Sequence, residues 1–250
     1  MKLRLPLATS RAGFTLLEVL VASVVLAIVL AILLGTLTTS MSLWRNTEGK
    51  IAADREGRSA DLLLADDLMN AVMPANRNLW PRTNNGSLQF LTARPRDYQG
   101  TSSADVGDVC FVEYQVDAAN STLTRRFLAS RETFDDIITA GQFPSPSSQD
   151  SQLLAVNVMK GTADAVRGFG LAGVANPANF VVLNTNMIAL TGAYSTNNPP
   201  TAIEVNLAVA DPTSMEPENK AIWEANTSVV LRNAGIYSFR VSLPNPPPSP

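Results

Sequence analysis

Glu18 is the residue whose type and position most clearly suggest chemistry. It is the one charged residue in an otherwise apolar run over about residues 13–37. A run of this length is what a helix needs to cross a bilayer hydrocarbon core of about 30 Å. A carboxylate in a membrane helix is costly and usually marks function, because it needs a partner. The chemistry predicted for Glu18 is therefore ion pairing in a medium of low dielectric constant.

The composition argues against an enzyme. The chain has 250 residues, no His and a single Cys, Cys110. A Ser-His-Asp triad, a Cys-His pair and the commonest zinc ligand are therefore missing. Lys50, Lys160 and Lys220 lie in no recognisable Ser–Lys nucleophile motif, and residues 168–170 lack the rest of a dinucleotide-binding loop. We expect no catalytic residue and no cofactor.

The aspartates do not predict a metal site. Asp66 and Asp67 are neighbours on a predicted helix, so their side chains diverge, and we interpret both as part of a solvated face. Asp105 and Asp108 could contribute to a calcium-binding loop, but the spacing of an EF-hand is absent. The sequence therefore predicts no bound metal.

Basic residues flank the apolar run unevenly. Lys2, Arg4 and Arg11 precede it, and Arg45 is the first basic residue after it. By the positive-inside rule, the short leader stays cytoplasmic and the rest of the chain is translocated. The net charge is −3 and no basic run follows the leader, so no direct nucleic-acid partner is expected.

Residues 11–19 form a recognisable motif, Arg-Ala-Gly-Phe-Thr-Leu-Leu-Glu-Val. The motif resembles the cleavage and methylation site of type IV prepilins and type II secretion pseudopilins, and the resemblance covers about residues 8–45. It implies that a prepilin peptidase cuts after Gly13, that Phe14 becomes N-methylated, and that Glu18 guides assembly. The alternative is an ordinary signal anchor that happens to contain a Glu.

Elementary electrostatics agrees with this motif. An ordinary secretory signal is cut after its apolar region, whereas a cut after Gly13 leaves the apolar helix in the mature protein. The cut also creates an α-amino cation on Phe14. In a filament core, that cation and Glu18 of a neighbouring subunit would each lack water, and pairing them would fix the axial register of the helices.

The expected fold class is α+β and pilin-like, with a long N-terminal helix packed on a mostly antiparallel β-sheet head. Gly35, Gly49 and Gly57 each weaken a helix by about 1 kcal/mol relative to Ala, so the sequence allows bends or local melting there. The expected segments are a cleaved leader (1–13), a transmembrane and filament-core helix (14–43), a continuation packing on the head (44–73), a β-rich periplasmic head (74–243) and a Pro-rich tail (244–250).

The head contains one clear hairpin. Residues 109–116 alternate as a half-buried strand does, and residues 122–128 form its partner. Cys110 is expected to be a buried strand thiol. Residues 141–151 form a Pro/Ser-rich loop that could separate two halves of one sheet. Further predicted strands are 87–93, 153–159, 180–182, 202–209, 229–231 and 236–243, and residues 132–140 are a predicted short helix.

The resemblance implies a minor pseudopilin-like structural subunit of a type II secretion pseudopilus. The predicted location is the bacterial inner membrane, crossed once, with a cytoplasmic N-terminus and a periplasmic head. Implied partners are the prepilin peptidase, other pseudopilin or pilin subunits, the inner-membrane assembly platform and membrane lipid. Two alternatives remain, a minor pilin of a type IV pilus or DNA-uptake filament, and a membrane-anchored binding protein that never polymerises.

The motif predicts how the N-terminus is processed. Mass spectrometry of the mature protein should find Phe14 at the N-terminus, monomethylated, in cells that contain the peptidase. Gly13→Val should block the cut, because a branched side chain crowds the peptidase site. An intact Met1 terminus in wild-type protein from such cells would contradict the motif assignment.

Overall fold

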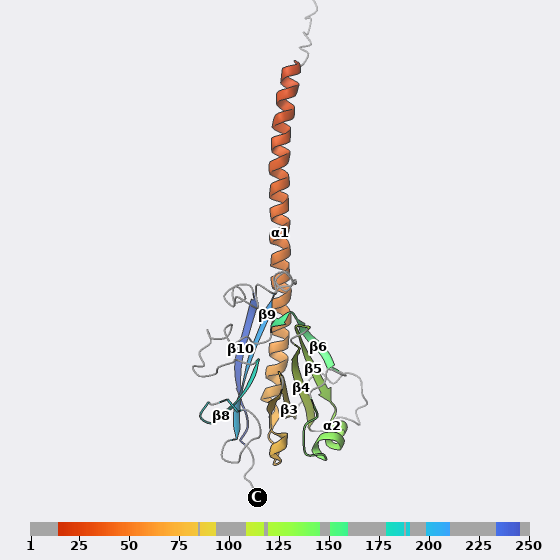
Figure 1. Ribbon diagram of the computed structural model, residues 1–250, viewed down its shortest axis with the longest axis vertical. Helices are drawn as coiled ribbons and strands as arrows, with labels where there is room; N and C mark the ends of the chain where they lie inside the picture. Colours follow the sequence, from red (N-terminus) through yellow and green to blue (C-terminus); the bar gives the residue numbers. More distant parts are fainter. Residues whose placement is uncertain are drawn as a thin grey trace, which may run out of the picture. The chain divides into compact units, whose positions relative to one another are not determined.

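The structure is a computed structural model that describes residues 15–84, 86–93, 109–117, 120–145, 151–159, 179–187, 189–190, 199–210 and 234–245. The chain divides into two units, Met1–Thr47 and Glu48–Pro250. Helix α1, Leu16–Met69, continues from the first unit into the second. All described β-strands belong to the second unit (Figure 1).

In the first unit, α1 is apolar on all sides from about residue 19 to residue 35, after Glu18. Its described side chains, from residue 16 to residue 47, are all exposed in the single chain. The run is rich in Leu and Ala, which favour a helix, and α1 is long and apolar enough to cross a membrane. A helix that is apolar all round needs apolar surroundings, either lipid or other helices.

Helix α1 ends at Met69, before the predicted end at residue 73. It ends there because β1 (Ala71–Val72) pairs antiparallel with β3 (Ser87–Thr92). The helix is continuous through Gly35, Gly49 and Gly57. The local melting that the sequence allowed at these glycines therefore does not occur in the structure.

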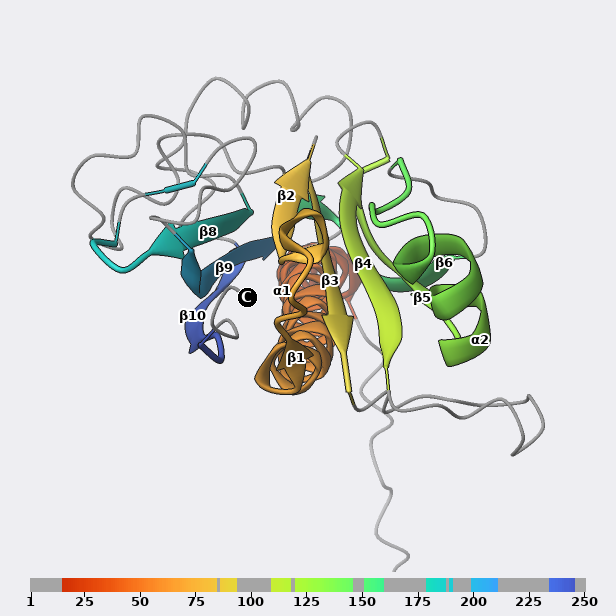
Figure 2. The same cartoon turned by 90° about the horizontal axis from the view of Figure 1, so that it is seen from below.

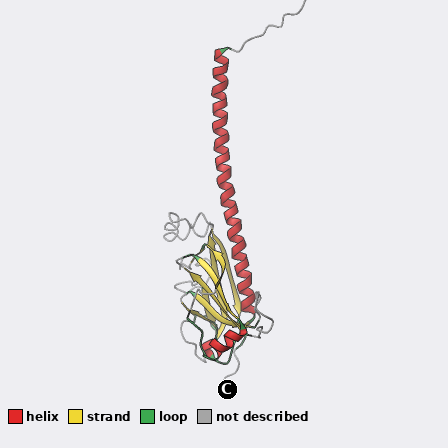
Figure 3. Cartoon of the chain, turned by 90° about the vertical axis from the view of Figure 1, so that its right-hand side faces the viewer, coloured by secondary structure: helices red, strands yellow, loops and turns green. Residues whose placement is uncertain are grey.

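The second unit contains two antiparallel sheets, and Figure 3 shows their strands in yellow. The other strands are β2 (Arg82–Asn84), β4 (Cys110–Asp117), β5 (Thr122–Leu128), β6 (Ser151–Val156), β7 (Val158–Met159), β8 (Phe180–Asn184), β9 (Pro200–Ala210) and β10 (Ala234–Ser242). Sheet A has the order β1-β3-β4-β5-β6, and β2 also pairs with β3. Sheet B has the order β10-β9-β7, and β8 also pairs with β9. The predicted α+β class is confirmed.

The chain changes sheet at a single residue. Asn157 has a φ of 57°, and it divides the predicted strand 153–159 into β6 of sheet A and β7 of sheet B. Its carbonyl accepts from the Ala210 N–H (3.0 Å), while the next N–H, of Val158, donates to the Ser121 carbonyl (2.8 Å). The 141–151 loop is therefore not a boundary between sheet halves. Predicted strand 229–231 lies outside the described residues.

One hydrophobic core joins α1 to both sheets (Figure 2). Fully burying a large apolar side chain typically stabilises a fold by about 1.5–3 kcal/mol. Residues 48–69 of α1 therefore gain their packing from the two sheets together. The core includes Ala53, Ala60, Leu64 and Leu68 of α1, Leu88, Phe90, Val112 and Leu123 of sheet A, and Ile203, Val205, Leu207 and Val209 of sheet B.

Strand β4 is buried on both faces, so the half-buried pattern predicted for residues 109–116 is wrong. One face of β4 is covered by a segment made of helix α2 (Ser130–Glu132) and the π-helix η3 (Thr133–Ile138), close to the predicted short helix 132–140. Ile137 of this segment belongs to a second hydrophobic cluster, which also contains Leu79, Leu91, Phe111 and Phe143. Cys110 is buried as expected, and burial raises the pKa of its thiol to about 11.

Gly57 lets strand β10 approach α1 closely. The ring of Tyr237 packs directly on Gly57, and a Cβ at that position would overlap the ring. The Tyr237 hydroxyl donates to the Asp54 carboxylate (2.7 Å) and reaches the Asp54 carbonyl oxygen (3.0 Å). A glycine that costs helix stability is thus retained where packing requires it.

Gly57→Ala should lower the free energy of unfolding of the head by about 1–3 kcal/mol, because the added methyl group overpacks the Tyr237 contact. Gly35→Ala is the matched control, since nothing lies within 4 Å of a Cβ there. It should leave head stability unchanged. Denaturant unfolding of the full chain in detergent, followed by fluorescence of buried Trp80, would measure both. Equal effects of the two substitutions would refute this packing role.

Candidate functional site

The start of α1 brings Thr15 and Glu18 together. The Glu18 N–H donates to the Thr15 carbonyl (3.0 Å) and lies 3.3 Å from the Thr15 hydroxyl. The spacing Ser/Thr-x-x-Glu is that of a capping box, in which a side-chain oxygen accepts from a free N–H of the first turn. No role was predicted for Thr15, although the spacing of Thr15 and Glu18 indicates this cap.

Hydroxyl groups along the apolar part of α1 are bonded within the helix. The Ser23 hydroxyl donates to the Leu20 carbonyl (2.8 Å), and those of Thr38 and Thr39 both donate to the Gly35 carbonyl (2.9 Å). Thr36, Ser42 and Thr47 bond in the same way. Such bonds let a polar side chain enter an apolar medium without an unsatisfied donor.

The Glu18 carboxylate is different. It is exposed in the first turn of α1, and no ion pair or hydrogen bond joins it to another described residue. The free N–H groups of a helix N-terminus favour a negative charge nearby, but they do not replace a counter-ion in an apolar medium. Gly13 and Phe14, the other predicted site residues, lie outside the described residues.

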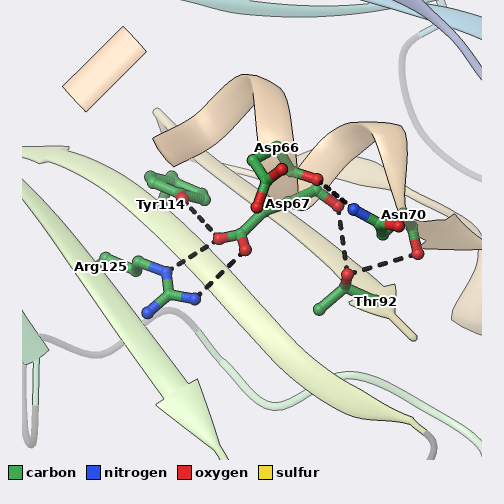
Figure 4. Close-up of polar contacts among 6 residues, drawn as sticks. All are labelled: Asp66, Asp67, Asn70, Thr92, Tyr114 and Arg125. Carbon is green, nitrogen blue, oxygen red and sulfur yellow. Dashed lines mark hydrogen bonds and ion pairs between the residues drawn. The ribbon is translucent and has the colours of Figure 1, made fainter. Parts of the chain in front are cut away.

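A second carboxylate, Asp67, is buried at the other end of α1, so our interpretation of Asp66 and Asp67 as a solvated face is wrong for Asp67. Figure 4 shows the Arg125 guanidinium and the Tyr114 hydroxyl pointing at Asp67. The Arg125 Nε donates over 2.9 Å and the Tyr114 hydroxyl over 2.6 Å to the same carboxylate oxygen, while Arg125 Nη2 lies 3.3 Å from the other. Asp67 thus ties α1 to β4 and β5.

Burial is the largest influence on the pKa values of Asp67 and Tyr114. It raises the pKa of the Asp67 carboxyl, whereas the charge of Arg125 and the bond from Tyr114 act to lower it. Burial, followed by the charge of Asp67, raises the pKa of Tyr114 well above its ordinary value. Tyr114 therefore stays a neutral donor, and the charge of Arg125 offsets part of the cost of burying the Asp67 carboxylate.

Backbone groups at the end of α1 also find partners beside Asp67. The Thr92 hydroxyl lies 3.2 Å from the Asp67 carbonyl and 3.3 Å from the Asn70 carbonyl (Figure 4). The Ala93 N–H donates to the Asn70 carbonyl (2.9 Å), and the Asn70 amide donates to the Asp66 carbonyl (2.8 Å). These bonds satisfy carbonyls that a helix end leaves free.

The remaining candidates do not form a chemical site in the part of the chain that the structure describes. No group of three or more Cys, Asp or Glu side chains is placed to hold a metal ion there. Lys50 is exposed on α1. Asp105, Asp108, Lys160, Lys220 and residues 168–170 lie outside the described residues.

Removing the Asp67 carboxylate should be strongly destabilising. Asp67→Ala leaves Arg125 buried without a counter-ion and should lower the free energy of unfolding by about 3–5 kcal/mol. Asp135→Ala is the control, because its 3.9 Å contact with Arg131 is exposed and should contribute less than about 1 kcal/mol. Replacing Asp67, Tyr114 and Arg125 together by Leu, Phe and Met should recover most of the loss. Denaturant unfolding would measure all three, and equal losses for Asp67→Ala and Asp135→Ala would contradict the assignment.

Comparison with known proteins identifies the N-terminal segment. A family model described as the prokaryotic N-terminal methylation motif matches residues 9–34. Curated protein sequences give no match. A chain of the GspK-GspI-GspJ complex from the type 2 secretion system of enterotoxigenic Escherichia coli is 12% identical, with 79% of this chain and 99% of that chain covered and a TM-score of 0.37. The type IV-like pilin TTHA1219 from Thermus thermophilus is 13% identical, with 76% and 95% covered and a TM-score of 0.37.

The methylation motif spans the positions where sequence reasoning placed cleavage, methylation and the carboxylate. It is followed by an apolar helix and an antiparallel β-sheet head. The chain therefore carries a prepilin-type N-terminal methylation motif at residues 9–34, the segment that contains Gly13, Phe14 and Glu18.

Proposed function

We propose that this chain is a minor pseudopilin-like structural subunit of a type II secretion pseudopilus. One observation carries the proposal: a methylation motif leads directly into a helix whose first part, to about residue 37, has Glu18 as its one charged residue. A helix needed only as an anchor has no use for a carboxylate in its first turn, because burying the charge costs free energy.

Processing supplies the missing partner of Glu18. The prepilin peptidase cuts after Gly13, and the new amino group on Phe14 is a cation, which N-methylation does not remove. Glu18 follows Phe14 by four residues, about 6 Å along a helix. Pairing Glu18 of one subunit with the Phe14 amine of another therefore sets a stagger between adjacent helices. Either charge buried alone would cost several kcal/mol.

The membrane holds the subunit before it assembles. The basic leader keeps the N-terminus in the cytoplasm, and about 20 apolar residues from Leu16 onward span the hydrocarbon core of the inner membrane. The head then lies in the periplasm. The inner-membrane assembly platform moves the helix from lipid into the filament, where the helices of other subunits replace lipid around it.

The size of the head favours a minor subunit. The second unit, Glu48–Pro250, is larger than the heads that major pseudopilins usually carry. The role that we propose is structural.

Glu18→Leu separates assembly from anchoring. The variant should still be cleaved at Gly13 and remain in the membrane at the wild-type level, because its helix is more apolar. It should nevertheless lose crosslinking to neighbouring subunits through a photoreactive residue at Leu33, and secretion should fall at least tenfold. Glu48→Leu makes the same chemical change on α1 beyond the apolar run and should behave like the wild type.

The outcomes distinguish the mechanisms. Loss of crosslinks with unchanged membrane levels supports charge pairing between subunits. Wild-type crosslinking and secretion by Glu18→Leu would show that the pair is not used. A failure of cleavage in Glu18→Leu would assign the carboxylate to peptidase recognition instead.

A further inference from the structure

Trp44 is the one aromatic residue of α1, and its side chain is 73% exposed. Its neighbour Arg45 is also exposed, and no ion pair or hydrogen bond joins Arg45 to another described residue. Both residues belong to the first unit of the chain, Met1–Thr47. An exposed indole ring gains free energy on contact with an apolar partner, and a guanidinium gains strong bonds when it meets an anion.

The pair lies at the end of a long uncharged stretch. Residues 19–44 contain no Asp, Glu, Lys or Arg, and Arg45 is the first charged residue after Glu18. As a helix, this stretch is about 39 Å long, whereas the hydrocarbon core of a bilayer is about 30 Å thick. The stretch is longer than the core, so its apolar character alone does not fix the depth of α1 in a membrane.

The last part of the stretch tolerates either lipid or water. Residues 36–42 are rich in Thr and Ser. The Thr36 hydroxyl donates to the Leu33 carbonyl (2.9 Å), and the Ser42 hydroxyl donates to the Thr39 carbonyl (2.9 Å). These bonds leave no unsatisfied donor in lipid, and the same hydroxyl oxygens can accept from water. The depth of α1 is therefore decided by the residues that follow this segment.

Trp44 and Arg45 have the chemistry of the zone between hydrocarbon and water. An indole ring is apolar but carries one N–H donor, and Trp is enriched where acyl chains meet headgroups. The long apolar stem of Arg lets its guanidinium reach outward from a backbone position near the acyl chains. A guanidinium also matches the oxygens of a phosphate group. A phospholipid satisfies both residues at once.

We propose that Trp44 and Arg45 form a phospholipid-binding site in the periplasmic leaflet of the inner membrane. The ring of Trp44 packs against the acyl chains close to the glycerol, and the guanidinium of Arg45 bonds the lipid phosphate. The site rests on the proposed function, because it requires α1 to cross the inner membrane with the head in the periplasm.

The site fixes the depth of Glu18. About 39 Å of helix separates Glu18 from Trp44, close to the thickness of about 40–45 Å that a bilayer has with its headgroup regions. With Trp44 at the periplasmic headgroups, Glu18 lies at the cytoplasmic headgroups, where water solvates its carboxylate. This depth moves the start of the membrane span from Leu16 to a position just after Glu18. The electrostatic cost of Glu18 then arises when the helix leaves lipid for the filament.

Depth-resolved quenching of Trp44 fluorescence tests the position of the ring. Full-length protein is placed in vesicles of phosphatidylethanolamine and phosphatidylglycerol with bromine atoms either close to the glycerol or near the chain ends. The difference between the wild type and Trp44→Phe isolates Trp44 from Trp80 and Trp223. Bromine close to the glycerol should quench this difference signal at least twofold more strongly. Stronger quenching from the chain ends, or no quenching from either position, would overturn the inference.

Native mass spectrometry of the full-length protein released from detergent tests the role of the guanidinium. Arg45→Gln should lower the fraction of protein with bound phospholipid at least threefold, and Arg45→Lys, which keeps the charge, should restore part of it. Lys50→Gln removes an exposed cation of α1 beyond the first unit and should keep the wild-type fraction. Equal losses in Arg45→Gln and Lys50→Gln, or displacement of the lipid by inorganic phosphate alone, would contradict the site.

A photoreactive residue at position 44 identifies the occupant in membranes of cells that lack the other filament subunits. Its adducts should have the mass of a phospholipid, whereas adducts to a protein in place of lipid would refute the inference. None of these measurements depends on cleavage after Gly13 or on pairing of Glu18. A failure of the lipid site therefore leaves the proposed function standing, and the proposed function is tested separately by Glu18→Leu.

Discussion

A carboxylate removed from water needs a positive or hydrogen-bonding partner, and α1 meets this requirement differently near its two ends. Asp67 finds its partners within the chain, since Arg125 and Tyr114 both bond its carboxylate. Glu18 has no such partner among the described residues. The first arrangement closes the head, whereas the second leaves a charge that no described residue neutralises. The same electrostatic cost stabilises the fold at Asp67 and, in the filament that we propose, favours assembly at Glu18.

Within the head, carboxylates of α1 determine how the helix faces the two sheets. Asp54 accepts from Tyr237 of sheet B, Glu56 accepts from the Val156 N–H (3.1 Å) at the end of β6, and Asp67 accepts from Arg125 of sheet A. Apolar packing alone tolerates small rotations of a helix, but these bonds have directions. They therefore hold the exposed side chains of Ile51, Leu62 and Met69 away from the core.

Short sequence patterns predicted the parts of this structure that depend on residues close together in the sequence. The apolar run, the methylation motif and the hairpin of β4 and β5 could all be read from short stretches. The burial of Asp67 could not, because nothing near it in sequence distinguishes it from Asp66, and its partner Arg125 lies 58 residues away. The sequence also did not predict that the α2–η3 segment covers β4. The covered face of β4 includes Glu113 and Gln115, which are residues typical of a strand face exposed to solvent.

The single-residue change of sheet at Asn157 has a consequence for the order in which the head is synthesised. Every strand of sheet A precedes this residue, so α1 can pack on the complete sheet A before most of sheet B has been synthesised. The contacts of α1 with sheet B form later, because Tyr237 of β10 follows its partner Asp54 by 183 residues. One side of the helix, including Gly57, therefore stays open to water and to other proteins until the last strand has been synthesised.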